Sequence, residues 1–212
     1  MPILTDLKNA LSFLRRGEFK ELLFRFRVYF SEIDLRYASA DELGLCADRS
    51  YHYAHSGGVN LEQVLNDLDI TQEDAIVDFG SGKGGALATF ASYPFAKITG
   101  IELLPELVAI AKRNFEILKI SNVHMVVSDA AEFTDLDDYN YFYFYSPFPG
   151  KVMTAVLQNI QSSLLEKPRA AHLIYCNPEF HDVVVNDSAF RKTAEFYHHQ
   201  LHHPIYLYSN QP

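Results

Sequence analysis

Cysteine is scarce in this sequence, and tryptophan is absent. The two cysteines, Cys46 and Cys176, lie far apart and lack the spacing of a metal site or a redox pair. This usage argues against a disulfide framework and suits a reducing compartment. We therefore expect two packing residues in a cytoplasmic protein.

Long apolar runs and excess positive charge are also lacking. No stretch of about 18 uninterrupted apolar residues occurs, and we find no signal peptide, so no transmembrane helix is expected. The formal net charge is -9, which argues against nucleic acid as a partner because such binding depends on clustered lysine and arginine. The length of 212 residues suits one α/β domain with an appendage.

The appendage is predicted at residues 1–50. Leucines and phenylalanines recur there at helical spacing on both sides of Gly17, which predicts two amphipathic helices. Up to Phe30 the segment carries six basic and three acidic residues. Two interpretations stay open, a weak contact with an anionic membrane surface through residues 1–30 or a helix pair that acts as a lid or as a homodimer contact. The second is favoured.

A glycine-rich turn is the most informative motif of the chain. The apolar run from Ala75 to Phe79 leads into Gly80-Ser81-Gly82-Lys83-Gly84-Gly85 and then into a helical pattern. The spacing fits a dinucleotide fingerprint, with Glu102 as the ribose-binding acid. Asp78, however, stands two residues before the first glycine, where its carboxylate would repel a diphosphate. A cofactor that carries a cationic amino acid would instead be attracted.

On these residues the sequence resembles the class I S-adenosylmethionine-dependent methyltransferases from about Tyr51 to the C-terminus. The resemblance implies that Asp78 and the turn surround the methionine part, that Glu102 meets the ribose hydroxyls and that Asp129 meets the adenine amine. The implied cofactor-binding residues are Asp78, Gly80, Ser81, Gly82, Gly84, Glu102, Leu103, Asp129, Ala130 and Ser146.

The resemblance also places a substrate side at Ser146-Pro147-Phe148, after the predicted strand 141–145. It implies that Ser146 and Tyr145 orient the nucleophile, and that Pro147 and Phe148 line the pocket. Asn177 follows the next strand and is expected beside Ser146 as a further catalytic residue, and Tyr53 is a candidate substrate contact. The family's nitrogen-methylating members have Pro-Pro-aromatic where this chain has Pro-Phe-Pro, so the acceptor atom stays open.

Apolar patterns beyond the turn alternate between strand and helix. Strands are predicted at 75–79, 97–101, 123–127, 141–145, 172–176, 195–199 and 205–208, and helices at 60–68, 86–92, 106–118 and 151–165. This order predicts a doubly wound, Rossmann-like α/β fold, with a mostly parallel seven-stranded sheet and a C-terminal antiparallel hairpin. The histidines at 198, 199, 202 and 203 fall at alternating strand faces, so no metal site is predicted.

The resulting hypothesis has an N-terminal helical segment, residues 1–50, and a methyltransferase domain, residues 51–212. The domain would transfer a methyl group from S-adenosylmethionine to a protein side chain or a small molecule. Two alternatives remain open, an NAD(P)-dependent oxidoreductase and a non-catalytic scaffold subunit that binds the cofactor.

Overall fold

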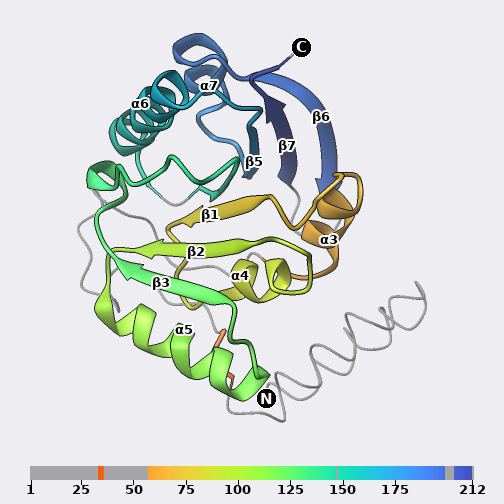
Figure 1. The fold of residues 1–212 in the computed structure, drawn as a ribbon, viewed down its shortest axis with the longest axis vertical. Helices are drawn as coiled ribbons and strands as arrows, with labels where there is room; N and C mark the ends of the chain where they lie inside the picture. The colour runs from red at the N-terminus through yellow and green to blue at the C-terminus, as the bar shows by residue number, and fades with distance from the viewer. Residues whose placement is uncertain (1–32, 36–56, 147, 199–202, 212) are drawn as a thin grey trace.

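A seven-stranded sheet forms the centre of the chain in the computed structural model, which describes residues 33–35, 57–146, 148–198 and 203–211 (Figure 1). The strands are β1 (Ala75–Phe79), β2 (Lys97–Glu102), β3 (Val123–Val127), β4 (Tyr141–Tyr145), β5 (His172–Cys176), β6 (Arg191–His198) and β7 (His203–Ser209). Their order across the sheet is β3-β2-β1-β4-β5-β7-β6.

The direction of the strands follows from how they are connected. Strands β1 to β5 run parallel because a crossover separates each from the next, whereas β7 pairs antiparallel with both β5 and β6. The predicted fold class, a mostly parallel sheet with an antiparallel C-terminal hairpin, is confirmed. The sheet order reverses at β1, so the carboxyl ends of β1 and β4 border the point where open α/β sheets bind ligands.

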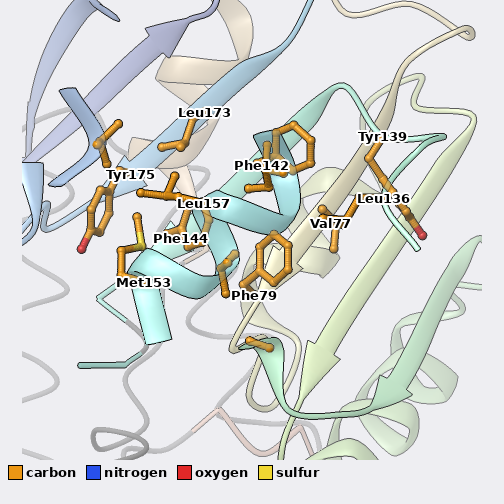
Figure 2. Close-up of a cluster of buried hydrophobic side chains, with 14 of the residues drawn as sticks. Val77, Phe79, Leu136, Tyr139, Phe142, Phe144, Met153, Leu157, Leu173 and Tyr175 are labelled. Atoms are coloured by element: carbon orange, nitrogen blue, oxygen red, sulfur yellow. The ribbon is translucent and has the colours of Figure 1, made fainter. Parts of the chain in front are cut away.

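Helices cover both faces of the sheet. One face carries α6 (Gly150–Glu166) and α7 (His181–Asp187), and the other carries α3 (Val59–Asn66), α4 (Gly85–Phe90) and α5 (Pro105–Leu118) (Figure 1). Side chains alternate between the faces along each strand. Val77 and Phe79 therefore pack toward α6, as Figure 2 shows together with Phe144 and Leu157, whereas Ile76 packs toward α3 and α4.

The elements differ from the sequence prediction mainly near the C-terminus. Helix α7 was not predicted, because its seven residues carry too few apolar positions for a helical period. Strand β6 begins four residues before its predicted start, since Arg191 to Ala194 already pair with β7. Among the described residues no helix is long and apolar enough to span a membrane, and none of their side chains form a metal-binding cluster. The predicted N-terminal helices fall almost wholly outside these residues.

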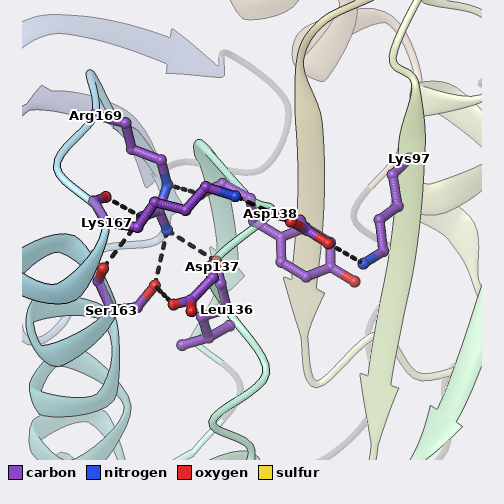
Figure 3. Close-up of polar contacts among 8 residues, drawn as sticks. Lys97, Leu136, Asp137, Asp138, Ser163, Lys167 and Arg169 are labelled. Carbon is purple, nitrogen blue, oxygen red and sulfur yellow. Dashed lines mark hydrogen bonds and ion pairs between the residues drawn. The ribbon is translucent and has the colours of Figure 1, made fainter.

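The amino ends of the strands are closed by a polar network (Figure 3). The Arg169 guanidinium donates to the backbone oxygens of Leu136 and Tyr139, 2.8 and 2.7 Å away, and to Oγ of Ser163, 3.0 Å away. The Ser163 hydroxyl in turn donates to Asp137. The network thereby connects the loop before β4 to the end of α6, at the edge of the sheet opposite the carboxyl ends of the parallel strands.

Candidate functional site

Asp78 is a buried carboxyl group at the carboxyl end of β1. Only 3% of the residue is exposed, and its side chain makes no hydrogen bond to any described residue. Burial, and then the charge of Glu102, raises the pKa of Asp78 well above its usual range. A buried polar group without a protein partner is costly. The position therefore fits a cationic ligand group that would satisfy the carboxylate.

The turn after β1 is held by the neighbouring strand. The N–H groups of Gly80 and Ser81 both donate to the carbonyl of Ile101 in β2, at 2.9 and 3.0 Å. Gly80, Gly82 and Gly84 all have positive φ, the region that favours glycine. At Gly84 a Cβ would lie 2.5 Å from Cζ of Phe115, so a side chain is excluded by contact as well as by conformation. The three glycines give the backbone a path that no other residues would follow without strain.

Glu102 ends β2 and connects two loops. Its Oε2 accepts from the N–H of Gly82 at 2.8 Å, and its Oε1 accepts from the N–H of Leu104 at 2.9 Å. Burial raises the pKa of Glu102, and hydrogen bonds from Leu104, Gly82 and Leu103 act in the opposite direction. The side chain predicted to meet a ribose thus also fixes the glycine turn, a role that its sequence position did not reveal.

Asp129 lies in the loop that follows β3. Its Oδ1 accepts from the N–H of Ala131 at 2.9 Å and so caps the short 3₁₀ helix η1 (Ala130–Glu132). The N–H of Ser128 donates to the carbonyl of Glu102, which places this loop beside the end of β2. The structure therefore brings the predicted adenine-side residues next to the predicted ribose-side residue.

Lys83 is the charged residue of the glycine turn. The structure buries its side chain, with 6% exposed, and places its Nζ 3.1 Å from Oδ1 of Asp34. Asn114 of α5 bridges the same two segments, because its Nδ2 donates to the carbonyls of Asp34 and Lys83. Residues 33–35 consequently lie against the glycine turn, as the orange segment beside α5 in Figure 1 indicates.

Ser146 and Asn177 meet at the carboxyl ends of β4 and β5. The strands pair in register up to Tyr145 and Cys176, so the next two residues face each other. The Ser146 hydroxyl donates to the backbone oxygen of Asn177, and Nδ2 of Asn177 donates to Oγ of Ser146 at 3.0 Å. Both residues have positive φ, 34° and 50°, which is uncommon without glycine and clusters at functional sites.

The other predicted substrate-side residues have different surroundings. Tyr145 is half-buried, and burial raises the pKa of its hydroxyl to about 12. Phe148 is buried against Phe144, with ring centroids 6.2 Å apart, and its place in a pocket wall stays a prediction. Pro147 and Tyr53 lie outside the described residues. The site that the structure assembles is therefore built mainly on Ser146 and Asn177.

Comparisons with known proteins find similarity to methyltransferases. A family model described as a methyltransferase domain matches residues 76–167. A curated relative, the protein-L-isoaspartate O-methyltransferase of Pyrococcus horikoshii, is 29% identical over 133 residues, which cover 62% of this chain and 55% of the relative. The chain thus spans about half the length of that protein.

Solved structures share the fold at low sequence identity. A SAM-dependent methyltransferase from Aquifex aeolicus superimposes with a TM-score of 0.56 at 14% identity, over 71% of this chain and 88% of that one. The magnesium protoporphyrin IX methyltransferase of Synechocystis, solved with bound SAM, gives 0.54 at 15% identity, over 70% and 75%. The chain therefore shares the fold of these methyltransferases, and residues 76–167 match the model of a methyltransferase domain.

Proposed function

We propose that this protein transfers a methyl group from S-adenosylmethionine to a protein side chain or a small molecule. The observation that carries the proposal is the buried Asp78 carboxyl group, which has no hydrogen-bond partner among the described residues and lies directly before the glycine turn. The ammonium group of the methionine part would supply the missing positive charge. A diphosphate would place a second anion at the same point.

The remaining residues fit the other parts of this cofactor. The positive-φ turn at Gly80 to Gly84 lets a ligand approach the backbone, and the Glu102 carboxylate has lone pairs left for ribose hydroxyls. Asp129 and Ala130 lie next to Glu102, where an adenine would follow the ribose. These residues follow the ends of β1, β2 and β3 in turn. Their order matches the order of methionine, ribose and adenine in the cofactor.

The chemistry demands little from the protein beyond alignment. When bound, S-adenosylmethionine supplies a methyl group on a sulfonium, which is already activated for in-line displacement. The chain then has to hold the acceptor in line and exclude water. Two observations support this role for Ser146 and Asn177. They meet at the ends of β4 and β5, and β4 pairs with β1 on the side away from β2.

Isothermal titration of the full chain with S-adenosylhomocysteine and with NADH tests the cofactor. We expect micromolar binding of the first and none of the second. Asp78→Asn should lower the affinity at least about 100-fold, because the buried charge partner is lost. The exposed acid Asp135 supplies the matched control, since Asp135→Asn makes the same chemical change on the surface and should leave binding unchanged.

Two outcomes would reject the proposal in different ways. Tight binding of NADH without S-adenosylhomocysteine would favour the oxidoreductase. Binding of S-adenosylhomocysteine without methyl transfer from labelled S-adenosylmethionine to any protein, amine or carboxylic acid acceptor would favour the scaffold subunit.

A further inference from the structure

The hydrogen-bond donors of Ser146 and Asn177 are all used within the site. The hydroxyl proton of Ser146 goes to the backbone oxygen of Asn177, and the two amide hydrogens of Asn177 go to Oγ of Ser146 and to Oε1 of Glu179, 3.0 and 3.2 Å away. The backbone N–H of Asn177 donates to the carbonyl of Pro204 at 3.0 Å. No hydrogen on these side chains is left for a substrate.

Glu179 fixes the orientation of the amide. A carboxylate can only accept hydrogen bonds, so the nitrogen of the Asn177 side chain, and not its oxygen, has to face Glu179. Ser146 Oγ then accepts a hydrogen bond from the same nitrogen, so the Ser146 hydroxyl has to donate its own proton to the backbone oxygen of Asn177. The exposed Glu179 carboxylate therefore sets the orientation of the Asn177 amide, and through it that of the Ser146 hydroxyl.

The side chains of Ser146, Asn177 and Glu179 have only acceptors left after these hydrogen bonds. Oγ of Ser146 keeps one lone pair, Oδ1 of Asn177 accepts from no described residue, and Glu179 is exposed and forms no ion pair with any described lysine or arginine. Such a surface attracts a group with several hydrogens and positive charge, and it repels a carboxylate. We propose that these three residues select an acceptor that presents an amine or ammonium group, an inference that rests on the proposed methyl transfer.

The reaction then balances as follows. An acceptor that binds as ammonium would first release one proton to water. The neutral nitrogen would then use its lone pair to form the new N–C bond while the C–S bond breaks, so positive charge would pass from sulfur to nitrogen. The methylated ammonium can release one proton to water at the exposed Glu179 and become neutral again. Ser146 Oγ and Asn177 Oδ1 would each accept a hydrogen bond from an N–H group of the amine. These bonds would orient the nitrogen lone pair toward the methyl carbon.

A matched pair of probes tests the selectivity. Phenethylamine and 3-phenylpropionate share the ring and the two-carbon chain and differ in the charged end. We expect the full chain to bind the amine about tenfold more tightly by ligand-observed NMR, with and without S-adenosylhomocysteine. Glu179→Gln should weaken amine binding about fivefold and improve carboxylate binding, because the new amide can donate. Glu166→Gln, an exposed acid at the end of α6, is the control and should change neither affinity.

Three results would overturn the inference. These are equal or tighter binding of the carboxylate probe, no binding of either probe at millimolar concentration, and equal effects of Glu179→Gln and Glu166→Gln. Failure of S-adenosylhomocysteine to bind would count against the proposed function alone, since the probes are also compared in its absence.

Discussion

Nζ of Lys83 lies 3.1 Å from Oδ1 of Asp34, although 49 residues separate the two along the chain. The lysine belongs to the glycine turn and is almost fully buried, whereas the aspartate side chain is 28% exposed. Asn114 adds hydrogen bonds to both backbones. The segment at residues 33–35 is thus attached directly to the loop that we propose holds the cofactor.

Removal of this ion pair should cost stability. Asp34→Asn leaves the buried lysine without this anionic partner, and we expect a loss of about 1–3 kcal/mol in the free energy of unfolding. Urea denaturation followed by circular dichroism measures it. The exposed pair Lys192–Glu195 supplies the control, because Glu195→Gln should change stability by less than about 0.5 kcal/mol. Equal losses in the two variants would show that burial of Lys83 does not strengthen its pairing.

Asp78→Asn should stabilise the ligand-free protein. Because the folded-state pKa of Asp78 lies above the unfolded value, its contribution to stability is fully present below about pH 4 and declines as pH rises through the raised folded pKa. The neutral amide avoids this loss, so we expect a gain of about 1–3 kcal/mol at neutral pH that vanishes in acid. Thermal unfolding across pH measures the gain. A variant less stable than the parent at pH 7 would contradict it.

The same carboxyl group should make cofactor affinity depend on pH. A protonated Asp78 cannot attract an ammonium group, so the affinity for S-adenosylhomocysteine should rise as pH rises through the elevated pKa. Titration calorimetry at a series of pH values would record the increase. Repeating it in buffers of different ionisation enthalpy would show whether binding releases protons. A flat profile would mean that another group holds the ammonium.

Gly84→Ala should destabilise the turn by about 2–4 kcal/mol, since it combines a left-handed backbone with a contact to the Phe115 ring. The double variant Gly84→Ala/Phe115→Leu separates the two causes. The smaller leucine relieves the contact and leaves the backbone strain. Gly84→Ala should therefore cost less stability in the Phe115→Leu background than in the parent protein. An equal loss in both backgrounds would mean that the contact contributes nothing.

Cys176 should resist alkylation in the folded protein. Burial raises the pKa of its thiol to about 12, so the reactive thiolate is almost absent at pH 8. We expect mass spectrometry of the Cys176 peptide to find no iodoacetamide adduct until urea unfolds the chain. Labelling under native conditions would show that the carboxyl end of β5 opens.

Much of the sheet could be predicted because its strands are short, apolar and bounded by turn residues. Strands β1, β3, β4 and β5 match their predicted bounds. The place of Asp78 before the glycine turn could be predicted equally well, because the pattern consists of residues close together in the sequence. The pairing of Asn177 with Ser146 followed from the order of the strands, and it lies where the parallel register requires.

The rest depended on contacts between distant segments. Nothing in the residues around Lys83 reveals Asp34, and nothing around Glu102 reveals that its carboxylate would accept from Gly82. The burial of Phe148 against Phe144 likewise depends on packing that the residues around Phe148 do not reveal. Glu179 was overlooked because an acid after a proline is an ordinary surface residue until its neighbour Asn177 is placed.

The insertion of β7 between β5 and β6 has a consequence for the order in which the sheet is completed. Until β7 docks, β6 has no strand to pair with, and the backbone of β5 is open along one side. A folding intermediate without docked β7 therefore has an open strand edge, and it would be prone to pair with other chains.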